Sequence, residues 1–136
     1  MDSTQVCIIG AGPAGSMSAL RLGKEKIPFI LIDKDTFPRQ KICGDVLSGK
    51  VPHIMRRLSP ELVQRFEKQC EPLHSFGMRF MVPGEYTFDV PFIFDYNPEI
   101  HPIPGYTLRR EIFDAFMVDE VSKLNVGKVI TGQKVE

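Results

Sequence analysis

Two short apolar runs flank a glycine-rich segment near the start of the chain. Residues 4–9 and 29–32 contain continuous rather than alternating apolar runs, which predicts buried parallel strands. Between them, Pro13 suits the first turn of a helix, and we expect that helix to end between Gly23 and Ile27. The pattern therefore predicts a strand, a helix and a second strand in succession.

The hydrophobic period changes twice in the middle of the chain. Residues 51–70 have helical spacing, with Ser59 as a good N-cap and Pro60 at a first helical position. Residues 74–92 alternate on either side of Pro83-Gly84, which predicts a hairpin with a type II turn. One face of this hairpin is aromatic: Phe76, Phe80, Tyr86, Phe88 and Phe92. Such a face either covers an ordinary core, which we favour, or lines a pocket for a long apolar substrate.

The last third of the chain returns to the first pattern. A proline-studded connection follows the hairpin and is not expected to hold regular structure. Apolar residues at helical spacing predict a helix over 109–124, and a final strand is expected at 129–131. With the first two strands, this strand would form one side of a parallel sheet of order 3-2-1-4-5, in which strand 1 is an edge.

The glycine-rich segment has the spacing of a dinucleotide-binding turn. Gly10 permits a tight turn, Gly12 lets a pyrophosphate approach the backbone, and Gly15 lets the helix pack against the strand. Unpaired N–H groups of the first helical turn attract anions. Asp33, at the end of the second strand, is placed to accept hydrogen bonds from a ribose; the alternative is a solvated strand-end acid. Backbone groups of Pro13 and Ala14 complete the predicted cofactor turn.

Composition excludes several classes of protein. The 136 residues include 17 basic and 17 acidic side chains, so nothing favours nucleic acid or an anionic membrane as partner. The apolar run before the glycines is too short to span a membrane. Cys7, Cys43 and Cys70 form no CxxC pair, which favours a reducing, cytoplasmic location. We expect Cys7 in the core and Cys70 at the surface or a helix end.

The loop after the second strand carries the remaining candidate chemistry. Arg39 and Lys41 place positive charge beside Cys43, and face either a bound anion such as a phosphate or simply solvent. Basic neighbours lower a thiol pKa, and a thiol before a flexible glycine can approach a bound cofactor, although no nucleophilic role is assigned to Cys43. The alternative is that Cys43 is a packed small residue. Arg110 begins a helix, a poor place for a cation unless it serves an anion. No metal site is expected, because the three histidines (His53, His74 and His101) lack ligand spacing and are interpreted as structural.

Four stretches together resemble a known family: VCIIGAGPAG, ILIDKD, FPRQKICGD and LRREIFDAF. They resemble the N-terminal part of FAD-dependent oxidoreductases of the geranylgeranyl reductase type, within the wider group of flavin hydroxylases and halogenases. Pro38, Lys41, Cys43 and Gly44 fit that family's P-x-x-K-x-C-G loop, and Arg110 opens its R-x-x-F-D helix. Two departures are Asp33, where glutamate is more usual, and Asp45, where a second glycine is common.

The resemblance implies an α/β fold of the glutathione-reductase type. It consists of a Rossmann-like FAD-binding βαβ unit with an incomplete parallel sheet, plus an antiparallel hairpin from the start of the substrate domain. The implied domains are 1–73 for FAD or NAD(P) and its cofactor loop, 74–105 for the hairpin and proline-rich connection, and 106–136 for the return to the FAD domain. The implied cofactor-binding residues are Gly10, Gly12, Pro13, Ala14, Gly15, Asp33, Lys34, Arg39, Lys41, Cys43, Gly44, Asp45 and Arg110.

The resemblance also implies a reaction, with alternatives left open. FAD, reduced by NAD(P)H, would reduce carbon–carbon double bonds of an isoprenoid, an apolar substrate for which peripheral membrane contact is conceivable. The alternatives are a flavin-dependent monooxygenase or halogenase, an NAD-binding dehydrogenase domain, which Asp33 suits, and a non-catalytic cofactor-binding fragment. Family members are much longer, so we expect the chain to be a fragment of a larger enzyme, marginally stable alone or dependent on a partner.

Overall fold

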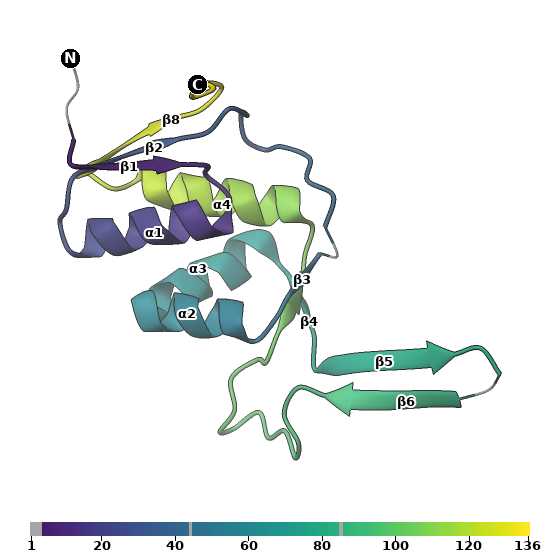
Figure 1. Cartoon of the computed structure of the whole chain (residues 1–136). Helices are drawn as coiled ribbons and strands as arrows, with labels where there is room; N and C mark the ends of the chain where they lie inside the picture. Colours follow the sequence, from purple (N-terminus) through teal and green to yellow (C-terminus); the bar gives the residue numbers. More distant parts are fainter. Residues whose placement is uncertain (1–3, 44, 85) are drawn as a thin grey trace. The chain divides into compact units, whose positions relative to one another are not determined.

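The computed structural model describes residues 4–43, 45–84 and 86–136 (Figure 1). The chain folds as two compact units. Unit 1 holds the chain up to Cys43 and again from Arg109 onward, and unit 2 spans residues 44–108. These junctions differ from the predicted boundaries at residues 73 and 105, and the functional assignment of the segments between them stays a prediction.

Unit 1 is a parallel sheet with two helices on one face (Figure 1). The strands lie in the order β1-β2-β8, so the predicted strand–helix–strand unit, the strand order and the edge position of the first strand are confirmed. The two helices pack against each other and against the sheet. The core between them contains Phe29 and Leu31 from the central strand and Phe113 and Met117 from the helix that follows Arg109. The elements are β1 (Val6–Ile9), α1 (Pro13–Lys24), β2 (Phe29–Ile32), α4 (Arg110–Ser122) and β8 (Gly127–Ile130).

The opposite face of this sheet is exposed along β1 and only partly covered along β2, and this overturns one expectation. We expected Cys7 in the core, but Cys7 is exposed, and Ile9 is 70% exposed. Successive residues of a strand point to opposite faces, so these two side chains point away from α1 and α4. The apolar run indicated a strand correctly, but it did not show which of the strand's two faces would be covered.

Unit 2 combines two helices, a small antiparallel sheet and a long hairpin (Figure 1). The predicted helix over 51–70 is two helices, because Ser59 is extended (φ −160°, ψ 124°) ahead of Pro60. A residue before proline disfavours the helical region. The elements are β3 (Val46–Leu47), α2 (Lys50–Leu58), α3 (Pro60–Cys70), β4 (Leu73–His74), β5 (Gly77–Val82), β6 (Tyr86–Pro91) and β7 (Tyr106–Thr107), with β7 pairing between β3 and β4.

The core of unit 2 lies between its two helices and β7. Met55, Leu62 and Phe66 are buried, and the Phe66 ring meets Tyr106 edge-on at 5.4 Å between centroids. The Tyr106 hydroxyl donates a hydrogen bond to the Glu67 carboxylate. Burial, followed by the Glu67 hydrogen bond, raises the pKa of Tyr106 above its usual range, so the phenol keeps its proton at a pH where an ordinary tyrosine ionises.

The hairpin is formed as predicted, but its aromatic face is exposed. Phe80 pairs with Phe88 across the strands, and their rings stack at 5.0 Å. The turn glycine, Gly84, has φ +106°, as the third position of a type II turn requires. Phe80 and Phe88 are 42% and 53% exposed. The favoured expectation that this face covers an ordinary core is therefore wrong for the described residues.

Candidate functional site

The glycine turn joins β1 to α1 and fixes both by close contact. Gly10 has φ +99°, and its N–H donates to the carbonyl of Ile32 at 2.7 Å. A Cβ on Gly15 would lie 1.9 Å from the carbonyl oxygen of Gly10, so only glycine fits there. Gly12 is the N-cap of α1, and no side chain among the described residues caps this helix end. Its first N–H groups therefore remain available to a ligand.

Asp33 lies at the end of β2, where the sequence predicted it, but it is buried rather than solvated. Its side chain is only 6% exposed. One carboxylate oxygen accepts a hydrogen bond from the N–H of Ala11 at 2.6 Å, and the other accepts one from the N–H of Asp35 at 2.9 Å. Asp33 thus ties the glycine turn to the loop after β2. Each oxygen keeps a second acceptor position for a ribose hydroxyl.

Arg39 reaches from the loop to the glycine turn. Its two terminal nitrogens lie 3.3 Å from Asp35, 3.6 Å from Asp114 and 4.0 Å from Asp33. A Cβ placed on Gly12 would lie 3.6 Å from Nη2 of Arg39. The Arg39 Nε is buried and has no hydrogen-bond partner among the described residues. The alternative of a solvated basic loop is therefore wrong for Arg39, whereas Lys41 is exposed as that alternative expects.

Arg110 is the first residue of α4, as predicted, and it forms an ion pair with Asp114 one helical turn later. Its Nε and Nη2 form a fork on the two oxygens of Asp114, at 2.9 and 3.1 Å. The Asp114 side chain is fully buried. The hydrogen bond to Asp114 is the main reason that the pKa of Arg110 is raised. Asp114 therefore lies between two guanidinium groups, those of Arg39 and Arg110.

Cys43 lies at the far side of this charged cluster. Arg110 Nη1 donates toward the Cys43 sulfur at 3.5 Å, and the cysteine is exposed. The alternative of a packed small residue is therefore wrong, and a role near the flavin stays a prediction.

Several predicted site residues have no part in this cluster. Lys34, Pro38 and Ala14 are exposed. Asp45 belongs to unit 2, where its carbonyl accepts the N–H of Leu108 at 2.9 Å. Gly44 lies outside the described residues. Their roles toward a cofactor stay predictions.

Two acids that hold this cluster together were not among the predicted site residues. Asp35 and Asp114 both contact Arg39, and Asp114 is the deepest charge in unit 1. Two signals were available for Asp114: it is the D of the R-x-x-F-D stretch, and it follows Arg110 by four residues on a helix, a spacing at which opposite charges meet. No comparable signal existed for Asp35, because the loop around it has no periodicity.

The described residues contain neither a candidate metal centre nor a candidate membrane-spanning helix. No group of three or more histidine, cysteine or acidic side chains there is arranged to hold a metal ion. None of the helices in the described part of the chain has the length and apolar character needed to cross a membrane. Two histidines make local contacts: His74 meets Tyr106 edge-on, and His101 accepts a hydrogen bond from the N–H of Asn97.

A comparison with protein families matches residues 3–124 to a family described as "FAD binding domain". Among curated proteins, a menaquinone reductase of Mycobacterium tuberculosis is 47% identical over 49 residues, covering 36% of this chain and 12% of that protein. A flavin-dependent halogenase of Armillaria mellea is 40% identical over 52 residues, covering 38% of this chain and 10% of that protein. The matched stretches thus span only a small part of these relatives.

Solved structures confirm the fold. The flavin-dependent halogenase CmlS superposes with a TM-score of 0.77 at 24% identity, over 100% of this chain and 24% of that one. The flavin-dependent monooxygenase PieE, solved with FAD and substrate, gives a TM-score of 0.72 at 20% identity, over 95% of this chain and 24% of that one. The predicted α/β fold, with a parallel sheet and added antiparallel strands, is therefore confirmed.

Proposed function

Because the chain belongs to the FAD-binding domain family, we propose that it holds the adenosine diphosphate end of FAD against the glycine turn. It would do so as part of a flavin-dependent oxidoreductase. The observation that carries this proposal is the meeting of three features at one point: the uncapped start of α1, the bare Cα of Gly12, and the guanidinium of Arg39 beside it.

The residues present fit such a ligand. A diphosphate needs donors and a close approach to the backbone, and a helix N-terminus supplies both. The Nε of Arg39 is a buried hydrogen-bond donor that has no acceptor among the described residues. Leaving a buried donor unpaired costs about 1–3 kcal/mol, so an anion that reached it would be stabilised. Asp33 would accept a ribose hydroxyl through its free acceptor positions.

The acids around the two arginines have a second role in this proposal. Arg39 and Arg110 would repel each other if they were left alone, and Asp114 lies between them with no exposed surface. It holds both guanidinium groups in place before any ligand arrives. A preorganised donor loses less entropy when it binds, which favours affinity.

Bound FAD would supply the two-electron chemistry, and the chain's residues would bind and orient it. For the reaction class, we favour a monooxygenase or halogenase, which the likeness to the Armillaria halogenase and to CmlS supports. Reduction of a carbon–carbon double bond of an isoprenoid is the second candidate. The motif resemblance is the basis for this second candidate. NAD(P)H as electron donor is part of either proposal.

We call the glycine turn with Asp33 and Arg39 the FAD cradle. Calorimetric titration of the chain with FAD tests the contribution of Arg39 to this cradle. We expect Arg39→Gln to weaken FAD binding about tenfold or more, because a charge-assisted hydrogen bond contributes about 1.5–3 kcal/mol. The matched control is Arg21→Gln, an exposed arginine of α1 that pairs with Glu25. Unchanged FAD affinity in Arg39→Gln, with a circular dichroism spectrum like that of the wild type, would contradict the proposal.

A further inference from the structure

Unit 2 contains a pocket that the FAD cradle does not use. Its volume is about 570 Å³, within the range of small-molecule sites. Every lining residue belongs to unit 2, and none of them is acidic. They are Ser48, Gly49, Lys50, His53, Arg56, Phe92, Ile93, Pro102, Ile103 and Pro104.

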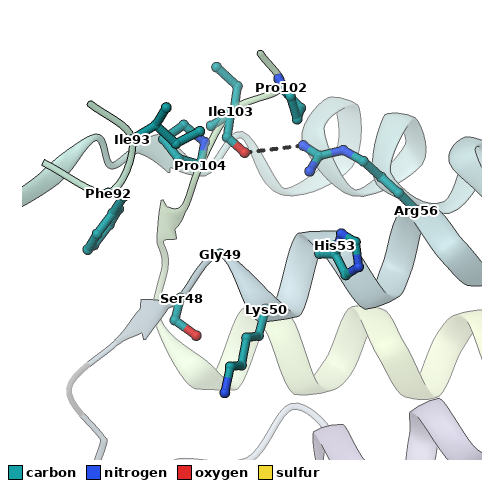
Figure 2. A pocket seen from close by; sticks show the side chains of 10 residues that line it. All are labelled: Ser48, Gly49, Lys50, His53, Arg56, Phe92, Ile93, Pro102, Ile103 and Pro104. Carbon is teal, nitrogen blue, oxygen red and sulfur yellow. Dashed lines mark hydrogen bonds between the residues drawn. The ribbon is translucent and has the colours of Figure 1, made fainter. Parts of the chain in front are cut away.

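One side of the pocket is formed by α2, whose helical period brings two basic side chains and a histidine to the same side. Lys50, His53 and Arg56 are spaced three residues apart, so they lie near one another along the helix surface. Arg56 is half-buried, and its Nη2 donates to the carbonyl of Ile103 at 3.3 Å (Figure 2). This bond and a side-chain hydrogen bond with Tyr106 fix the guanidinium at the pocket, and an arginine has five N–H donors in all, so donors remain for a further partner.

The facing side is apolar and conformationally restricted. Figure 2 shows Ile93, Pro102, Ile103 and Pro104 gathered across the pocket from α2. Proline fixes its own φ angle, so a wall that contains two prolines is largely preformed. Pro104 is buried, whereas Ile93 and Ile103 are partly exposed to the pocket.

We propose that this pocket binds an amphipathic oxyanion, a carboxylate or phosphate joined to a hydrocarbon body. The anion would lie against Arg56 and His53, and the hydrocarbon against Ile93 and Ile103. The guanidinium is planar and matches both kinds of oxyanion with paired hydrogen bonds. A neutral apolar ligand would leave the cationic side unpaired, and a small inorganic anion would leave the apolar wall in water.

Titration of the full chain with octanoate, followed by amide NMR and calorimetry, tests this proposal. We expect saturable binding with shifts in residues 48–56 and 92–104. Octyl phosphate should bind as well, and octanol at least tenfold more weakly, since it lacks the charge. Binding of both anions supports an oxyanion site, and whichever binds more tightly identifies the headgroup.

Matched variants make the test specific. Arg56→Gln and His53→Gln should each weaken octanoate binding, Arg56→Gln by about tenfold. Arg57→Gln, a neighbour on α2 that does not line the pocket, should leave it unchanged. Equal binding of octanol and octanoate, shifts confined to the hairpin, equal loss in Arg57→Gln, or no binding would each overturn the proposal. No FAD is present in this titration, so failure of the FAD cradle would leave its outcome unaffected.

Discussion

Replacing Gly12 or Gly15 of the glycine turn by alanine is expected to affect folding stability and FAD binding differently. In Gly12→Ala the new Cβ would have Arg39 Nη2 as its nearest neighbour, at 3.6 Å, an ordinary van der Waals distance, and Gly12 has φ −70°. In Gly15→Ala the new Cβ would lie 1.9 Å from the Gly10 carbonyl oxygen, which is backbone and has little room to move.

The magnitudes follow from these distances. Alanine at a compatible glycine position stabilises by about 0.4–1 kcal/mol through the unfolded chain, but alanine is a poorer N-cap than glycine and Gly12 caps α1. The two effects are of similar size, so Gly12→Ala should fold about as well as the wild type. Overpacking costs about 1–3 kcal/mol or more, which is a large part of a typical stability of about 5–15 kcal/mol. Gly15→Ala should therefore unfold at clearly lower urea concentration.

Cofactor binding should separate the two effects. A methyl group on Gly12 occupies the place where a diphosphate must approach the backbone and Arg39. Losing one or two charge-assisted hydrogen bonds costs about 1.5–3 kcal/mol each, or roughly ten- to hundredfold in affinity for each bond. Urea unfolding by circular dichroism and FAD titration by calorimetry measure the two properties. Normal FAD affinity in a folded Gly12→Ala chain would refute the reasoning.

Three further changes test other parts of the structure. Asp114→Ala should lower the free energy of unfolding by about 3–5 kcal/mol, because it leaves two arginines without their buried partner; a loss below about 1 kcal/mol in urea would contradict this. Phe66→Ala should cost about 3–5 kcal/mol, whereas Phe88→Ala on the exposed hairpin face should cost far less, so equal losses in urea would be evidence of a covered hairpin. Burial raises the pKa of Cys70 from 9.0 to about 11, so the thiol favours the folded state below pH 9 and this contribution is lost as the pH rises toward 11. Because the thiol is only partly buried, we expect only about 1 kcal/mol, seen as a shallower alkaline loss of stability in Cys70→Ser than in the wild type.

The parts of the fold that depend on local rules could be predicted from the sequence. The glycine spacing, the proline at the first position of α1 and the alternation around Pro83-Gly84 each specify a local conformation, and each element formed where expected. The break at Ser59 was also contained in the sequence, since Pro60 restricts the residue before it. We expected one helical stretch over 51–70 because we gave the apolar stripe more weight than the restriction that Pro60 places on Ser59.

Contacts made through the irregular loop could not be predicted in the same way. Arg39 reaches Asp35, Asp114 and the neighbourhood of Gly12 because of the path that the loop takes. That path follows no hydrophobic period. The exposure of Cys7 escaped prediction for a different reason. An apolar strand indicates the capacity to be buried on both faces, while the actual burial depends on what packs there.

The measurement that tests the central claim most directly is a calorimetric titration of the wild-type chain with FAD and, separately, with NADH. A visible absorbance spectrum of the purified chain should precede it, to detect flavin that is carried through purification. The account predicts saturable binding of FAD to the wild-type chain, and it predicts that NADH does not displace FAD from the glycine turn. Binding of NADH alone, or binding of neither by a chain whose circular dichroism shows it folded, would contradict the claim that this glycine turn holds FAD.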